Sequence, residues 1–499
     1  ALRPLELNQR DVVSLLGLVY EGLFEMDDNA QPQPKLAYAY SFSNDGRKLQ
    51  VTLRQDVTFH NGEALTSADV IATLDYMLEL SGFDDNLDSD TPVDERGLYY
   101  STFYSIRSWE ATDDYTVVFT LRRASYGSLY ALTFPILPVS QVASDMPSGT
   151  GPYKYDGYEQ GSAIWLTAND AWWNRAPQVR YIRASIYDTA DQALNAFDTQ
   201  SVDIAMTRSI NASRYSGSLN TFSLNARTRQ LEVLLVNRAY KDFKSDDNGQ
   251  NLLRQAIAYA IDYPTAATAI NGEYGKPANR GVLGPSFKGF DDSIAMLEYN
   301  AETAKSMLDA AGYIDADGDG WRELPDGGKM DLSVIPQYSR SMEVRSRLGE
   351  IVCKSLQNVG VNCHIDEEAI ANSEIWEDKV TKEEYDISIT FTTSGMLYST
   401  PFRYMLAELR DGDSGWHWGS CHDPRLKEYY YAMTEAINDE QYIENSRNLQ
   451  HLADEEMFGL TFAWQTGFFP YRTDKIEGWD NWQSWGVINA RTWFDLTAK

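Results

Sequence analysis

One acidic loop, residues 315–326, has the spacing of a cation-binding segment. It reads Asp-Ala-Asp-Gly-Asp-Gly-Trp-Arg-Glu-Leu-Pro-Asp, with acids at alternate positions before Gly320, where a calcium loop turns sharply. The candidate ligands are Asp315, Asp317, Asp319, the backbone carbonyl of Trp321, and Asp326 in place of the usual bidentate Glu. Two hypotheses follow: a structural calcium site away from any bound solute, or a solvated acidic turn after a helix.

Residue patterns that support catalysis are few. Gly412-Asp-Ser-Gly415 resembles the nucleophile segment of trypsin-like proteases, but Trp416 follows it and the surrounding pattern is not all-β. No Gly-x-Ser-x-Gly, His-Glu-x-x-His or phosphate-binding loop occurs, and the five His residues lack metal-ligand spacing. We therefore expect no enzymatic activity. A glycoside hydrolase with an aromatic cleft is the alternative from another class, since it needs only two carboxylates at a fixed separation.

The three cysteines, Cys353, Cys363 and Cys421, form no Cys-x-x-Cys pair, and an odd number cannot all pair within the chain. Cys353 falls in an apolar helical pattern, and Cys363 alternates with Val361 and Ile365 as in a half-buried strand. Buried free thiols are the simpler interpretation. A Cys353–Cys363 bridge is the alternative if the protein is secreted.

Charge and length exclude several classes of protein. The chain has 499 residues, enough for two or three domains, and a net charge of -30 from 43 basic and 73 acidic residues. Such a surface repels the phosphates of nucleic acids and anionic lipids. No run of 18 apolar residues occurs, so no transmembrane helix is predicted, and no signal-peptide pattern is present.

The elements that must position any site change character along the chain. The first half is rich in strands, such as residues 49–53, 115–121 and 230–237, with a helix begun by the capping box Thr66-Ser-Ala-Asp69. After residue 237 the chain alternates helices, predicted at 252–261, 300–311, 341–357, 424–438 and 439–457, with strands, predicted at 330–335, 361–365 and 385–391. This alternation predicts a largely parallel sheet covered on both faces.

Short motifs follow one another in a fixed order along the chain: Val19-Tyr-Glu-Gly-Leu23, Pro34-Lys-Leu-Ala37, Ser43-Asn-Asp-Gly46, Leu53-Arg-Gln-Asp-Val-Thr-Phe-His-Asn-Gly62, Ala68-Asp-Val70, Gly149-Thr-Gly-Pro-Tyr153, 197–205, Arg254-Gln-Ala-Ile-Ala-Tyr-Ala-Ile-Asp262, Ala310-Ala-Gly-Tyr313 and Val359-Gly-Val361. This ordered series resembles the oligopeptide- and dipeptide-binding proteins of ABC importers, the extracellular solute-binding proteins of family 5. Each motif alone is weak, but their order covers about the whole chain and is specific.

The resemblance implies an α/β fold of two lobes, the type II periplasmic-binding-protein-like fold, with mixed sheets and the ligand cleft between the lobes. Residues 1–34, 148–238 and 464–499 would form the core of lobe I. Residues 35–147 would be an extra inserted subdomain of lobe I, and 239–463 would form lobe II. Two strands, near 231–237 and 460–466, would connect lobes that close by a hinge motion.

The resemblance also implies where a solute is contacted: the N-terminal segment, the loop after the strand at 385–391, and the second connecting strand. The candidates, with aromatic residues added, are Asn8, Gln9, Thr393, Ser394, Met396, Tyr398, Trp416, Trp418, Trp464 and Gln465. Strand ends beside a crevice are the usual ligand positions in open α/β sheets. For any single residue among them, surface or packing roles are the competing interpretation.

One departure from the peptide binders bears on the solute. Those proteins carry an Asp for the peptide amino terminus in the loop that corresponds to residues 392–401, and here that loop has no acid. A buried ammonium without a counter-charge costs several kcal/mol. Either another carboxylate, such as Asp411 or Asp413, replaces it, or the ligand is no free-amine peptide. Because 13 Trp and 31 Tyr could stack on sugar rings, an oligosaccharide is the alternative solute.

The expected function is therefore capture of a peptide or similar small solute and its delivery to the permease subunits of an ABC transporter. Presentation of the solute to a sensor is a variant with the same fold. We expect a monomer with no nucleic-acid partner and no required cofactor, apart from the structural calcium considered above. The location implied is extracytoplasmic, as a cell-surface lipoprotein or in the periplasm.

Overall fold

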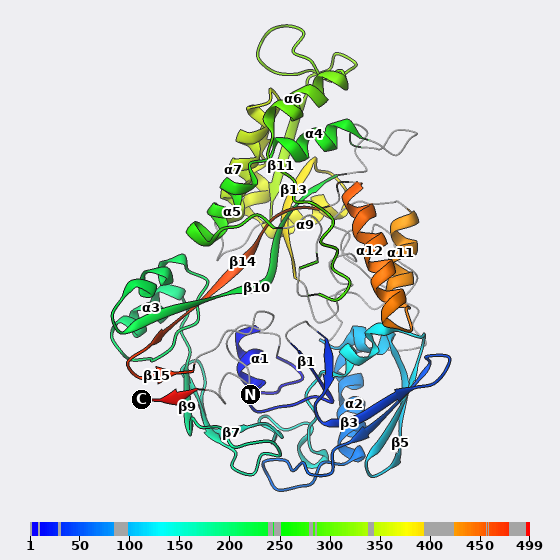
Figure 1. Ribbon diagram of the computed structural model, residues 1–499, viewed down its shortest axis with the longest axis vertical. Coiled ribbons are helices and arrows are strands. Elements are labelled where there is room, and N and C mark those ends of the chain that lie inside the picture. Colours follow the sequence, from blue (N-terminus) through cyan, green and yellow to red (C-terminus); the bar gives the residue numbers. More distant parts are fainter. Residues whose placement is uncertain are drawn as a thin grey trace.

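The computed structural model has an upper and a lower body joined by two long paired strands, β10 (Thr221–Val236) and β14 (Leu460–Arg472), as Figure 1 shows. The residues that the structure describes are 2–7, 10–27, 31–83, 98–237, 243, 251–278, 283–284, 287–337, 344–393, 424–455, 457, 459–478 and 496–499. Within these ranges, no helix has both the length and the apolar character needed to cross a membrane.

The lower body contains a four-stranded antiparallel sheet covered by one helix. The strands lie in the order β3 (Ala37–Phe42), β4 (Lys48–Leu53), β6 (Thr116–Leu121) and β5 (Ile106–Asp113), and the helix is α2 (Ser67–Ser81). The predicted capping box is confirmed, since the Asp69 carboxylate accepts a hydrogen bond of 2.8 Å from the backbone N–H of Thr66. The buried face of α2, with Val70 and Leu74, packs into the main hydrophobic core.

The lower body has further elements outside this sheet. They are α1 (Arg10–Leu16), β1 (Phe24–Met26), β2 (Pro32–Pro34), β7 (Tyr153–Glu159), β8 (Ala163–Ala168), β9 (Tyr181–Ser185), α3 (Ala190–Asp198), β15 (Ile476–Glu477), β16 (Thr497–Ala498) and the 3-10 helices η2 (Tyr100–Tyr104), η3 (Tyr126–Leu132), η4 (Val139–Gln141) and η5 (Ile210–Gly217). One hydrophobic core contains Leu23, Leu53 and Leu166, which come from the predicted domain segments 1–34, 35–147 and 148–238. The limits at 34, 147 and 238 stay predictions.

Two motifs of the sequence series, 19–23 and 149–153, meet a pair of Trp residues at the buried side chain of Glu21. Its carboxylate accepts hydrogen bonds from Thr150 Oγ1 at 2.9 Å, from Trp173 Nε1 at 2.9 Å and from Trp172 Nε1 at 3.3 Å. Burial raises the pKa of the Glu21 carboxyl above its usual range. The segment 19–23, the turn 149–153 and the Trp pair therefore form one structural unit.

The turn at Gly149 lies tightly against the neighbouring backbone. A Cβ atom at Gly149 would lie 2.0 Å from the carbonyl oxygen of Val19, a distance that only glycine tolerates. His60 closes the other side, with Nε2 donating to the Gly151 carbonyl at 2.9 Å and Nδ1 accepting from the Gly149 N–H at 3.3 Å. The neutral ring satisfies both partners, and burial lowers the pKa of His60 to about 4.

The upper body is built on a mixed five-stranded sheet with the order β12 (Asn362–Ile365), β11 (Asp331–Pro336), β13 (Ile387–Thr393), β10 and β14. β11 is parallel to β12 and β13, whereas β10 is antiparallel to β13 and β14. The prediction of a largely parallel sheet was therefore wrong, because both connecting strands enter this sheet in antiparallel pairing.

Five helices of the upper body lie close to their predicted bounds: α4 (Leu252–Ala260), α6 (Ala301–Ala310), α7 (Val344–Gln357), α11 (Pro424–Thr434) and α12 (Asp439–Glu455). The sequence pattern did not predict α5 (Tyr263–Asn271), α8 (Glu367–Ala371), α9 (Ser373–Thr381) or the 3-10 turn η7 (Gly272–Tyr274). Asn300 caps α6 as predicted, since its side chain accepts a hydrogen bond of 3.0 Å from the Thr303 N–H.

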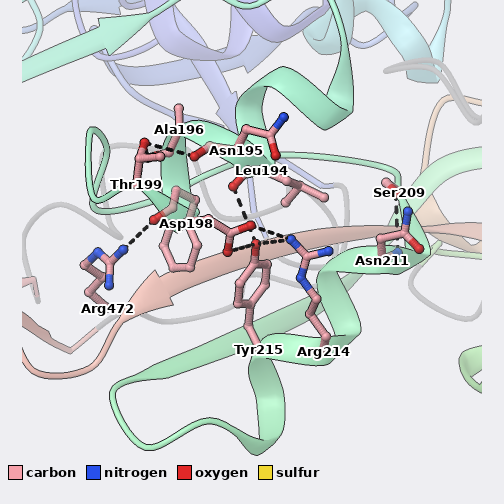
Figure 2. A network of polar contacts seen from close by, with 11 residues as sticks. Leu194, Asn195, Ala196, Asp198, Thr199, Ser209, Asn211, Arg214, Tyr215 and Arg472 are labelled. Carbon is pink, nitrogen blue, oxygen red and sulfur yellow. Dashed lines mark hydrogen bonds and ion pairs between the residues drawn. The ribbon is translucent and has the colours of Figure 1, made fainter.

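A polar network holds α3 and η5 against the lower end of β14 (Figure 2). Asp198, the last residue of α3, accepts hydrogen bonds from Arg214 and from the Tyr215 hydroxyl, both at 2.7 Å. Arg472 of β14 donates to the carbonyl of Phe197, and its guanidinium lies 4.8 Å from the Phe197 ring centroid. The network fixes the lower anchor of the paired strands.

Candidate ligand-binding site at the paired strands

The register of β10 and β14 breaks where the strands pass from one body to the other. Arg227 pairs with Thr466 and Leu231 pairs with Trp464, so three residues of β10 oppose one residue of β14. Below the break, Ala226 belongs to the core of the lower body, and above it Leu234 belongs to the core of the upper body. Such bulges bend a strand and increase its twist, as a connection between two lobes requires.

A buried carboxylate, that of Glu232, lies directly above the break. Its side chain is fully buried and accepts hydrogen bonds from Gln465 Nε2 at 2.7 Å, Gln230 Nε2 at 2.9 Å and Arg345 Nε at 2.9 Å. The Arg345 side chain is 4% exposed, so this is an ion pair removed from water. A buried charge persists only with such compensation.

The Glu232 network reaches the carboxyl ends of two parallel strands. The Arg345 guanidinium, from the first turn of α7, lies 4.5 Å from the ring centroid of Phe391 in β13. Gln337, directly after β11, accepts a hydrogen bond of 2.7 Å from the Thr390 hydroxyl. These polar residues thus lie at the carboxyl ends of the parallel strands, where α/β folds usually bind ligands.

Trp464 lies on the opposite face of β14 from Gln465. It packs with Leu231, Val233, Leu235 and Ala278, and is 8% exposed. Successive residues of a strand point to opposite faces, and Gln465 accordingly contacts Glu232. The two candidates on this strand are therefore placed at the connection between the bodies as expected, but they do not line one surface.

The Trp464 face carries buried hydrogen-bond donors without a partner. Among the described residues no acceptor reaches the Trp464 Nε1–H or the Thr392 hydroxyl. Both residues pair with Leu231 from either side, so their side chains share a face of the sheet. The half-buried Arg227 guanidinium lies 5.4 Å from the Trp464 ring centroid, and burial lowers its pKa. Unpaired buried donors cost about 1–3 kcal/mol each, which a bound acceptor would recover.

Most of the other candidates lie outside the described residues. These are Asn8, Gln9, Ser394, Met396, Tyr398, Trp416 and Trp418, together with the substitute acids Asp411 and Asp413. Thr393 is described as the last residue of β13, paired with Gln230. Sequence reasoning missed Glu232, whose only signal was a lone acid in an apolar strand, and Arg345, for which no local signal exists.

The acidic loop lies between α6 and β11, at the top of the upper body in Figure 1. Oxygen atoms of Asp315, Asp317, Asp319 and Glu323 all lie within 4.8 Å of one another. Carboxylate oxygens in this number suit a hard cation such as calcium. Glu323 completes the cluster, whereas Asp326, the position expected from the calcium-loop pattern, is outside it and accepts a hydrogen bond from the Gly328 N–H.

Comparison with known proteins identifies relatives along most of the chain. Residues 31–414 match the family model "Bacterial extracellular solute-binding proteins, family 5 Middle". The oligopeptide-binding protein AppA of Bacillus subtilis is 25% identical over 364 residues, covering 69% of this chain. Heme-binding protein A of Haemophilus influenzae is 23% identical over 368 residues, also covering 69%. The matches span 62% and 63% of these relatives, less than two thirds of their length.

Solved structures share the whole architecture. NikA from Brucella suis, in complex with Fe(III)-EDTA, has a TM-score of 0.81 at 19% identity, covering 100% of this chain and 97% of that one. AppA from Bacillus subtilis, in complex with a nonapeptide, has a TM-score of 0.70 at 18% identity, covering 100% and 96%. These likenesses confirm the two-lobed periplasmic-binding-protein fold. With a family model that matches well over half of its residues, the chain belongs to the bacterial extracellular solute-binding proteins of family 5.

Proposed function

We propose that this protein captures a small solute between its two lobes outside the cytoplasm and delivers it to the permease subunits of an ABC transporter. The observation that carries the proposal is the register break of β10 and β14 at the passage between the bodies, with unpartnered buried donors beside it. Two paired strands whose register shifts at Arg227/Leu231 and again at Glu232/Val233 can bend there and allow rigid lobes to close as a hinge. The protein acts as a monomer, binds no nucleic acid and does not alter the solute chemically. This function is compatible with a lipid-anchored form and with a free form of the protein.

We place part of the solute site on the Trp464 face of the sheet. Trp464 Nε1 and the Thr392 hydroxyl offer donors to acceptor groups of the solute, and the Trp464 ring supplies an apolar surface. The Glu232 carboxylate, on the other face, is already neutralised by Arg345. Glu232 therefore holds the hinge strands and α7 together and does not replace the missing acid for a peptide amino terminus.

The solute is a peptide or a similar small molecule, and an oligosaccharide is the alternative. The named relatives bind an oligopeptide and heme, and glutathione-binding protein GsiB of Salmonella typhimurium is 25% identical over 375 residues. Peptides of this kind offer carbonyl and carboxylate acceptors to the two donors. Sugars would instead use their hydroxyl oxygens and stack on the indole.

The two bodies also meet at a second contact, which the proposed closure would form. Tyr130 of η3 in the lower body is buried in one cluster with Leu426 and Met433 of α11. Arg123 and Glu435 add an ion pair of 3.7 Å beside it. Contacts of this size can form and separate with the lobes while β10 and β14 remain paired.

A thermal-shift screen tests this function with a peptide pool against an oligosaccharide pool. A solute at about one hundred times its dissociation constant adds roughly 2.7 kcal/mol of stability and raises the melting temperature by a few degrees. A shift with peptides supports the main proposal, and a shift with sugars alone supports the alternative. If neither pool nor a set of metal chelates and tetrapyrroles shifts the melting temperature, the proposed function fails.

A further inference from the structure

Two buried thiols of the upper body lie in contact. Cys353 is in the last turns of α7 and Cys363 is in β12, and their Sγ atoms are 3.0 Å apart. Both side chains are buried in the core of this body. A helix and the strand that follows it thus present two sulfur atoms to each other across only ten residues of chain.

The connection between the two elements fixes this arrangement. The N–H of Val361 donates to the Leu356 carbonyl at 3.0 Å, and Gly360 turns the chain with a φ of 83°. Gln357 Nε2 then donates to the carbonyl of Cys363 itself at 3.0 Å. Because these two hydrogen bonds and the conformation of Gly360 hold the turn, the approach of the sulfurs is a property of the fold and not of one side-chain rotamer.

The contact between the two thiols makes one of them easier to ionise. A hydrogen bond from the Cys363 thiol lowers the pKa of Cys353, and the same contact with burial raises the pKa of Cys363. When two such groups share a proton, the first ionisation becomes easier and the second harder. A thiolate is the nucleophile of thiol–disulfide exchange.

We propose that Cys353 and Cys363 are oxidised to a disulfide that ties α7 to the edge strand β12 in the mature protein. The inference rests on the proposed extracytoplasmic location, where disulfides persist. The oxidant belongs to the class of disulfide-bearing thiol oxidoreductases. The Cys353 thiolate attacks its disulfide and releases one oxidant thiolate; the Cys363 thiolate then attacks Cys353 Sγ and releases the second. Two electrons pass to the oxidant, whose sulfurs also take up the two protons.

The disulfide would join the edge strand β12 to helix α7. β12 is the edge strand of the sheet and pairs over four residues with β11. The other end of α7 carries Arg345, which holds Glu232 at the hinge strands. A disulfide would therefore fasten the outer edge of the sheet to the same helix that contacts the hinge, and it would stabilise this body through its short closed loop.

Peptide mapping tests the bond directly, because trypsin cleaves after Lys354 and so places the two cysteines in different peptides. Protein exported to an oxidising compartment is alkylated without reduction and digested. We expect the peptide of residues 348–354 to be linked to the peptide of residues 355–379, with a mass two hydrogens below the sum of the two peptide masses. We expect the peptide that contains Cys421 to be alkylated. Alkylation of both Cys353 and Cys363 would overturn the proposal, as would a Cys421 link to either.

Stability provides a second readout. Reductant should lower the melting temperature of the wild type by roughly 5 °C, the value expected for closing a loop of this length in a lobe of this size. The same loss is expected for the matched control Cys421→Ala, and none for Cys353→Ala/Cys363→Ala. An equal reductant effect in the latter variant contradicts the proposal. The solute screen is independent: solute binding without the linked peptide rejects the bond alone, and the linked peptide without solute binding rejects the proposed function alone.

Discussion

The ion pair of Glu232 and Arg345 should dominate the stability of the hinge region. Glu232 is fully buried with three donors, and Arg345 is nearly so. Glu232→Gln keeps the shape of the side chain but leaves the guanidinium buried without its counter-charge. Breaking such a pair costs about 3–5 kcal/mol. For a body of this size, this corresponds to a melting temperature lower by roughly 6–15 °C.

A double-mutant cycle measures the interaction energy between Glu232 and Arg345 separately from the effect of replacing each residue alone. Glu232→Gln/Arg345→Met removes both charges and should cost only about 1–2 kcal/mol, since replacing a whole buried pair is often close to neutral. The free energies of unfolding are measured in urea for the wild type, both single variants and the double variant. The coupling between the sites should then reach at least about 2 kcal/mol.

A surface pair provides the matched control. Asp378 and Lys382 are an exposed i,i+4 pair at 2.7 Å, and Asp378→Asn should cost less than about 0.5 kcal/mol. The reasoning would be refuted by a Glu232→Gln variant that loses less than about 1 kcal/mol, or by single-variant losses that simply add in the double variant.

Four further outcomes are expected. Trp464→Phe removes the unpartnered Nε1 donor and should weaken solute binding about five- to tenfold in calorimetry with little change in stability; unchanged affinity would place the solute elsewhere. Gly149→Ala forces a Cβ against the Val19 carbonyl and should destabilise the lower body by about 3 kcal/mol in urea unfolding, and a loss below about 1 kcal/mol would contradict the close approach. Calcium should raise the melting temperature by a few degrees and a chelator should reverse this in the wild type and in Asp326→Asn, but not in Asp319→Asn; no chelator effect would rule out the cation site. Because the folded pKa of His60, about 4, is below the unfolded value, its neutral form contributes stability above pH 6.5 that is lost as the pH falls toward 4. The loss should be up to about 3 kcal/mol relative to His60→Gln, and parallel pH curves for the two proteins would disprove it.

Local signals were enough to predict many elements. The capping box at Thr66 and the cap at Asn300 each need only a few neighbouring residues, and the structure confirms both. The lower half of β10 was missed because Arg227, Thr228 and Arg229 interrupt its apolar pattern. Such a polar stretch suits a strand that leaves one core and enters another.

Contacts between residues far apart in the chain could not be predicted from the sequence. Glu232 and Arg345 are 113 residues apart, and no local pattern matches an acid in a strand with a cation at a helix start. The antiparallel entry of β10 and β14 depends on how the chain crosses between the lobes, which alternation of helices and strands does not encode. Strand alternation alone could have assigned Trp464 and Gln465 to opposite faces.

The acidic loop shows how a motif can mislead in detail. The calcium-loop template directs attention to position 12, Asp326, because the helix after a regular loop brings that residue back to the cation. Here the chain leads into β11 instead, and the earlier Glu323 closes the cluster. The spacing predicted a cluster of carboxylates, whereas the residue that completes it depended on the element that follows.

Solute-induced closure is the most direct test of the proposed function. Small-angle X-ray scattering would be measured on the free protein and on the protein saturated with a solute found in the thermal-shift screen. Capture between hinged lobes predicts a smaller radius of gyration in the bound state, with affinity reduced by Trp464→Phe. A saturating solute that leaves both the scattering curve and the Trp464→Phe affinity unchanged would contradict capture at the paired strands.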